Sequence, residues 1–105
     1  VGFSMGGFAV WDIMQRLPST FAAAIPVSGG GDENLADELI DIPIWAFHGS
    51  SDRVVSPARS RNMINAIFTE GGSPVYTEYK SVGHNVWFRV FSNIKIIQWL
   101  FDQEK

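Results

Sequence analysis

Residues 2–6 have the pattern G-x-S-x-G, and a further glycine, Gly7, follows directly. A serine flanked in this way is typical of a nucleophile elbow, a sharp strand-to-helix turn that exposes the hydroxyl to a substrate. We expect strained backbone angles at Ser4, and we expect that a Cβ at either Gly2 or Gly6 would clash in so tight a turn. The motif is short enough to occur by chance. Its position at a strand–helix junction nevertheless predicts that Ser4 is a nucleophile.

A serine hydroxyl is a poor nucleophile at neutral pH and needs a base to take its proton during attack. His84 fits this role because an imidazole titrates near neutral pH. Asp52 would hold the imidazole in the right tautomer and stabilise its protonated form. The order Ser4, Asp52, His84 is the order of a Ser–Asp–His hydrolase. The backbone N–H of Met5, directly after the serine, would be one donor of an oxyanion hole.

Each of these roles has an alternative. Asp52 could serve only as a capping residue of its turn, and Asp32 is the rival acid. We favour Asp52 because its strand is the one that usually bears the acid. His48 is the rival base, but it precedes Asp52 and would break the expected order; we expect it to form hydrogen bonds within its own turn. Trp87 is a candidate wall of the substrate pocket, although a tryptophan is more often part of a core.

The apolar pattern predicts an alternation of helices and strands. The expected elements are a helix over 6–17, a strand over 21–27, one or two helical turns over 34–40, a strand over 43–47, a helix from 57 to the glycines 71–72, a strand over 75–79 and a helix over 86–103. Such alternation predicts an α/β fold, in which parallel strands are joined by crossover helices in three layers. Active groups gather at the carboxyl ends of such strands, which is where Ser4, Asp52 and His84 fall.

The composition narrows the class of protein. A net charge of −3 gives no electrostatic support for a nucleic-acid partner. The absence of cysteine excludes disulfides and thiolate metal sites, and the two histidines do not form a recognisable metal-ligand motif, so we expect neither a metal nor a cofactor. No apolar run approaches the length of a membrane span, about 18 residues. The cellular compartment stays open.

The runs 2–7, 21–32, 43–55, 76–79 and 83–87 resemble small serine hydrolases of the α/β-hydrolase superfamily. The similar branches are dienelactone-hydrolase-like, phospholipase/carboxylesterase-like, prolyl-oligopeptidase-like, and polyhydroxybutyrate-depolymerase or feruloyl-esterase-like. The resemblance implies Ser4 as nucleophile, Asp52 as acid and His84 as base, acting on a small-molecule ester through an acyl-enzyme. A serine peptidase of the prolyl-oligopeptidase-like branch is the alternative.

Members of these branches are longer than 105 residues. The resemblance implies that residues 1–105 are a partial domain, the C-terminal half of the fold, and that the first strands and the second oxyanion donor come from an upstream half. We therefore expect the upstream segment, or self-association, to cover an open sheet edge. A non-catalytic fragment is the remaining alternative for the function.

Overall fold

The computed structural model describes residues 1–103 and has an α/β fold, as expected. Its strands β1 (Gly2–Phe3), β2 (Pro26–Val27), β3 (Trp45–Gly49) and β4 (Val75–Tyr79) form one parallel sheet in the order β1-β2-β3-β4. The α-helices are α1 (Met5–Arg16), α2 (Ala58–Thr69), α3 (Trp87–Phe91) and α4 (Ile94–Asp102), and the 3-10 helices are η1 (Pro18–Thr20) and η2 (Glu33–Leu39). No helix within the described range is both long and apolar enough to cross a membrane.

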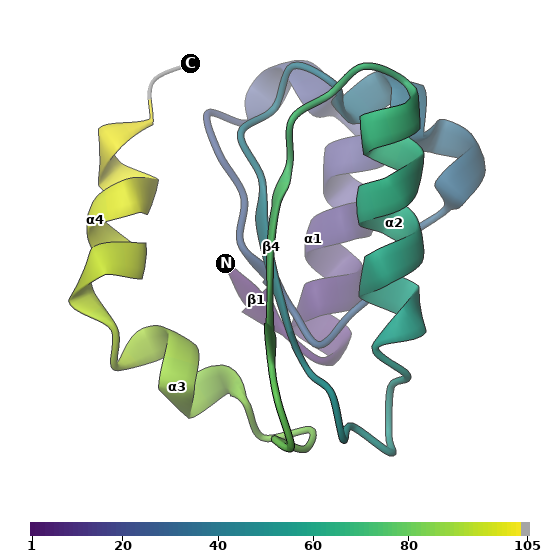
Figure 1. Cartoon of the computed structure of the whole chain (residues 1–105). Helices are drawn as coiled ribbons and strands as arrows, with labels where there is room; N and C mark the ends of the chain where they lie inside the picture. Colours follow the sequence, from purple (N-terminus) through teal and green to yellow (C-terminus); the bar gives the residue numbers. More distant parts are fainter. Residues whose placement is uncertain (104–105) are drawn as a thin grey trace.

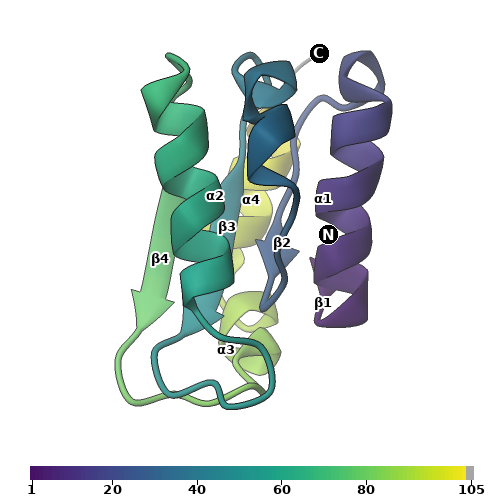
Figure 2. The ribbon, with the colours of Figure 1, turned by 90° about the vertical axis from the view of Figure 1, so that its right-hand side faces the viewer.

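The sheet separates two layers of helix (Figure 1). Helices α1 and α2 cover one face, and α4 lies along the other. Each layer has its own core because successive residues of a strand point to opposite faces. Ala46 of β3 packs toward α1 and α2 together with Trp11 and Met63. Its neighbour Phe47 packs on the opposite side with Val90. Figure 2, turned by 90° about the vertical axis, shows α1 and α2 in front of the strands, with the segment of η2 between them.

The strand expected over 21–27 is shorter than predicted, because only Pro26–Val27 and an isolated bridge at Ala24 pair with neighbours. The N–H of Ala24 donates to the carbonyl of Pro43, and that of Ser28 to Phe47. Pro26 has no N–H, so it cannot donate the hydrogen bond to β3 that would lie between those of Ala24 and Ser28. The ladder to β3 is therefore interrupted at Pro26.

The single helix expected over 86–103 is wrong, because the structure has α3 and α4 with a break at Ser92–Asn93. Asn93 has the extended angles φ −98° and ψ 106°, and its side chain accepts a hydrogen bond from the N–H of Lys95. An asparagine that does this caps the start of a new helix. The break turns the chain from the carboxyl edge of the sheet, near α3, back along its face as α4 (Figure 1).

Helix α2 ends at the two glycines, as predicted. Gly71 has φ +103°, its N–H donates to Phe68, and the N–H of Gly72 donates to Ile67. These two bonds form a Schellman motif, which needs a left-handed residue that glycine adopts without strain.

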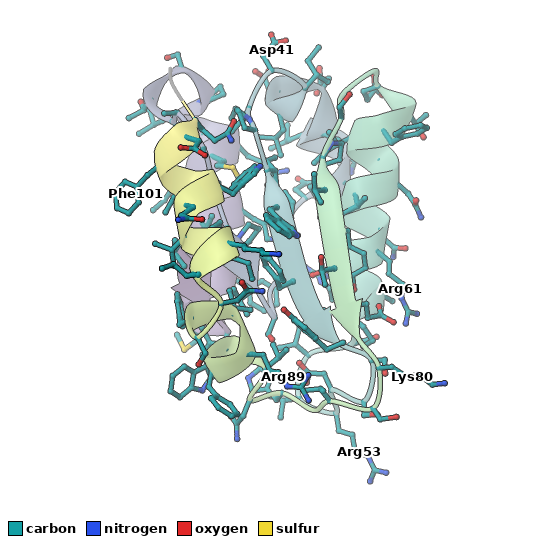
Figure 3. The ribbon with its side chains drawn as sticks, turned by 60° about the vertical axis from the view of Figure 1, so that its left-hand side comes forward. Asp41, Arg53, Arg61, Lys80, Arg89 and Phe101 are labelled. Carbon is teal, nitrogen blue, oxygen red and sulfur yellow. The ribbon has the colours of Figure 1, made fainter. Side chains whose placement is uncertain are left out.

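The outer face of the last helices carries apolar side chains. Figure 3 shows Phe101 pointing outward from α4, and it is 80% exposed. Phe88 and Ile94 are exposed as well. Strands β1 and β4 are the edges of the sheet in the described part of the chain. The upstream segment or self-association that we expect to cover an edge stays a prediction.

Candidate active site

Ser4 occupies the turn between β1 and α1. Its backbone angles are φ 56° and ψ −114°, which a residue with a side chain rarely adopts and which cost about 1–3 kcal/mol. The N–H of Ser4 donates to the carbonyl of Val27 at 2.9 Å, which fixes the turn at the end of β2. A Cβ on Gly2 would collide with the carbonyl of Gly6, so this position requires glycine as expected.

The expectation of a clash at Gly6 is wrong, because a Cβ there would point into open space. The glycine that the packing requires is Gly7. A Cβ on Gly7 would meet the carbonyl of Val27, and its next neighbours are backbone atoms of Gly29 at 3.2 Å. The first turn of α1 thus lies directly against the end of β2, and this contact sets the direction in which the helix leaves the serine.

The loop of His84 reaches the same edge through another glycine. Gly49 ends β3, and a Cβ there would collide with the carbonyl of Val82. Because this approach is open, the N–H of Ser51 donates to Val82 at 2.9 Å. The hydroxyl of Ser28, after β2, lies 3.4 Å from the carbonyl of His84. The histidine loop is therefore held by residues that follow the two central strands.

Ser4, His84 and Asp52 form a continuous chain of side-chain contacts. Nε2 of His84 lies 2.8 Å from Oγ of Ser4, and Nδ1 lies 2.8 Å from Oδ2 of Asp52. An ionised carboxylate only accepts hydrogen bonds, so Nδ1 carries the proton of the neutral ring. Nε2 then accepts from the serine hydroxyl. This arrangement can remove a proton from Ser4 and keep the resulting imidazolium beside a negative charge.

Asp52 is held in its ionised form and in one orientation. Its Oδ1 accepts the backbone N–H groups of Val54 at 2.9 Å and Val55 at 2.8 Å. Burial alone would raise the pKa of this carboxyl, but the hydrogen bonds from His84, Val55 and Val54 outweigh it and hold the pKa below its ordinary value. Asp52 is therefore negative at neutral pH, although its side chain is fully buried.

The rival residues lie elsewhere or contact other groups. Asp32 is exposed, its side chain accepts from the N–H of Asn34, and its backbone pairs with the amide of Gln15. His48 is fully buried, and its hydrogen-bond partners, the carbonyl of Val55 and the hydroxyl of Ser60, lie beyond the turn at 48–52 in which we expected them. His48 also lies 3.2 Å from Oδ2 of Asp52. Sequence reasoning missed this contact with Asp52, because the chain order counted against His48 as a base and gave no reason to pair it with the acid.

The two remaining predicted residues lie beside this chain of contacts. Met5 is the first residue of α1, where no preceding helical turn supplies an acceptor for its N–H. Trp87 begins α3 and is 43% exposed; its ring lies 6.2 Å from that of Phe3, edge to face. The ring of Phe3 lies 5.1 Å from that of His84, so Phe3 lies close to both Trp87 and the histidine.

The described residues form a cavity away from Ser4, and they do not form a metal site. An open cavity of about 420 Å³ beside α1 and the loop after β2 is lined by Phe8, Arg16 and Arg59 among others, but not by Ser4 or His84. Between residues 1 and 103 no group of three or more acidic and histidine side chains is placed to hold a metal ion.

No protein-family model matches the chain, and no curated protein matches it. Solved structures do match. A thermostable esterase is 38% identical with a TM-score of 0.95, over 99% of this chain and 30% of the esterase. Acyl-protein thioesterase 2 of Zea mays is 21% identical with a TM-score of 0.73, over 95% of this chain and 53% of the thioesterase.

A peptidase shares the fold as well. The acylaminoacyl peptidase of Pyrococcus horikoshii is 14% identical with a TM-score of 0.83, over 99% of this chain and 24% of the peptidase. The chain thus spans between about a quarter and a half of the lengths of these proteins. The chain is a structural match to part of the α/β-hydrolase esterases.

Proposed function

We propose that this chain carries the nucleophile, base and acid of a serine hydrolase that cleaves carboxylic esters. The observation that carries the proposal is the pair of 2.8 Å contacts that join Ser4 to His84 and His84 to Asp52. The positive φ of Ser4 supports it, because strained backbone angles gather at sites where a nucleophile must be presented. In this reading the turn at Ser4 is a nucleophile elbow.

The reaction would begin when Oγ of Ser4 attacks the ester carbonyl carbon and its proton passes to Nε2 of His84. The negative oxygen that forms would accept the N–H of Met5, at the positive end of the twelve-residue helix α1. His84 then returns the proton to the alcohol oxygen as the C–O bond breaks, which leaves an acyl group on Ser4. Water attacks this acyl group, His84 takes the proton of the water, and the proton returns to Oγ as the acid leaves.

Ester is favoured over peptide for two reasons. An alcohol is an easier leaving group than an amine, and the solved structure that is 38% identical is an esterase. A peptidase would use the same residues, and the likeness to the acylaminoacyl peptidase, at 14% identity, shows the fold alone. An apolar substrate group would find the half-exposed Trp87 near the site, so we propose that Trp87 borders the substrate.

A fluorophosphonate probe tests the proposal. The probe should form an adduct on Ser4, located by peptide mapping, and Ser4→Ala should abolish it. Ser51→Ala is the matched control and should label normally, because Ser51 is exposed and its bond to Val82 comes from the backbone N–H, which alanine keeps. A p-nitrophenyl acetate, butyrate and octanoate series beside peptide p-nitroanilides then separates esterase from peptidase. If the protein is folded and the probe does not label Ser4, the proposed hydrolase activity is refuted.

A further inference from the structure

The proposed mechanism gives no task to His48, although this histidine lies against its acid. His48 belongs to β3 and is fully buried. Its Nε2 is 3.2 Å from Oδ2 of Asp52, the same oxygen that accepts from Nδ1 of His84 at 2.8 Å. One carboxylate oxygen therefore lies between two imidazole rings.

The protonation of His48 follows from its other contacts. Nε2 is 2.8 Å from the carbonyl oxygen of Val55, which can only accept, so Nε2 carries a hydrogen. Burial lowers the pKa of His48 against the opposing effects of the Val55 bond and the charge of Asp52, so the ring is neutral. Nδ1 then carries no hydrogen; it lies 2.8 Å from the hydroxyl of Ser60, which also lies 3.3 Å from the carbonyl oxygen of Gly29. The carbonyl of Val55 therefore fixes the tautomer of His48.

This tautomer places its one N–H in the loop that holds the acid. The N–H of His48 bonds to the carbonyl of Val55, and Nε2 lies 3.2 Å from Oδ2 of Asp52. The same Val55 donates its own N–H to Oδ1 at 2.8 Å. A carboxylate rotates readily about its last side-chain bond, because that torsion has broad minima. His48 opposes such rotation at Oδ2 directly and at Oδ1 through the peptide of Val55.

We propose that His48 is a positioning residue for the Ser4–His84–Asp52 site. Its Nε2–H, oriented by the carbonyl of Val55, holds Asp52 so that Oδ2 faces His84 and keeps His84 in the Nδ1–H tautomer. The catalytic meaning of this role rests on the proposed function, whereas the effect on His84 does not. A histidine that only filled space and satisfied Ser60 would change the stability of the fold without changing the tautomer of His84.

Two substitutions of similar length separate these readings. His48→Gln keeps an N–H donor at the end of the side chain, and His48→Met has none. The measurement is the long-range ¹H–¹⁵N NMR spectrum of the His84 ring in the whole chain at neutral to slightly alkaline pH. The wild type and His48→Gln should hold His84 in the Nδ1–H form. In His48→Met the Nε2–H form should become substantially populated.

The rate of ester hydrolysis is a second measurement. With p-nitrophenyl acetate we expect His48→Met to lose about 10²-fold in kcat with little change in KM, as for a misplaced catalytic group. His48→Gln should stay within about tenfold of wild type. Ile67→Val, in the core of α2, is the control for lost stability. It should lower the urea midpoint of unfolding and leave both the His84 tautomer and kcat unchanged.

A folded His48→Met variant with an unchanged His84 tautomer overturns the proposal, and so does an equal loss in His48→Gln and His48→Met. If His48→Met does not fold, His48→Leu replaces it, because leucine also lacks an N–H donor and has a shorter side chain. An unchanged His84 tautomer in folded His48→Leu then overturns the proposal. The proposed function is refuted if the wild type neither reacts with the fluorophosphonate probe nor hydrolyses p-nitrophenyl acetate. If the tautomer of His84 still changes in His48→Met, the positioning role of His48 holds in that case.

Discussion

Replacing Asp52 by asparagine should reverse the proton pattern of the site while keeping its shape. Oδ1 of residue 52 accepts two backbone N–H groups, from Val54 and Val55, and an amide can satisfy both only with its oxygen. The NH₂ group must then take the place of Oδ2 and face Nδ1 of His84. Since NH₂ only donates, His84 must change to the Nε2–H tautomer, whose hydrogen points at Oγ of Ser4. A ring in that form cannot remove the proton of the serine.

The magnitude follows from these contacts. A base locked in the wrong tautomer typically costs about 10⁴ in kcat, which corresponds to about 5.4 kcal/mol in the activation barrier. Stability should fall too, because His48 cannot adapt as His84 does. Its Nε2–H, 3.2 Å from the position of the new NH₂, is fixed by the carbonyl of Val55. Two donors would face each other in a buried place, which costs about 1–3 kcal/mol in the free energy of unfolding.

The assay compares kcat with p-nitrophenyl acetate and urea unfolding for the wild type and Asp52→Asn. Asp32→Asn is the matched control, because Asp32 is exposed and an amide oxygen can still accept from the N–H of Asn34. It should keep wild-type kcat. A folded Asp52→Asn variant with kcat within about tenfold of wild type would show that Asp52 does not set the tautomer of His84.

Three further perturbations follow from local packing and charge. Gly7→Ala should lower the free energy of unfolding by about 3 kcal/mol or more, because its Cβ meets the carbonyl of Val27. Gly6→Ala, whose Cβ points into open space, should be neutral or raise the free energy of unfolding by up to about 1 kcal/mol. Urea denaturation compares the two variants. Because burial lowers the pKa of His48, the unfolded chain binds its proton first as the pH falls below about 6.5. The free energy of unfolding should then fall by up to about 1.4 kcal/mol per pH unit, and His48→Gln should remove this part of the slope in urea titrations on either side of that pH. Asn93→Ala should cost about 1 kcal/mol, through loss of the cap that starts α4, and should lower the thermal midpoint without a change in the ester assay.

The positions of the site residues at strand ends were predictable from the sequence. Asp52 and His84 each follow an apolar run, and the carboxyl ends of parallel strands meet at one edge, so their nearness to Ser4 needs no further information. The bond lengths depend on Gly49, whose missing side chain lets the histidine loop approach β3. That requirement comes from a loop more than thirty residues later in the sequence and leaves no local signal.

The sequence pattern did not predict the helix break at Asn93, the short strand β2 or the close approach at Gly7. The apolar spacing continues from Val90 through Ile94 without interruption, so Asn93 alone marked the end of one helix and the start of the next. Pro26 sits inside an apolar run that otherwise reads as a full strand, and its missing N–H shortened the ladder. The motif also drew attention to Gly6, whereas the close approach occurs at Gly7, because the partner is β2 and not the turn itself.

The hydrogen bonds that hold Ser4 beside β2 have a consequence for how the site would be lost. Within the described residues, β1 is two residues long and meets β2 through the N–H groups of Gly2 and Ser4, which donate to Ile25 and Val27. The partner of Ser4, His84, lies eighty positions away in the sequence. Local opening of this strand would withdraw the serine while both cores remain packed. In a denaturant series, reaction of Ser4 with the probe should therefore disappear before the helices unfold, and amide exchange at Ser4 should be faster than in β3.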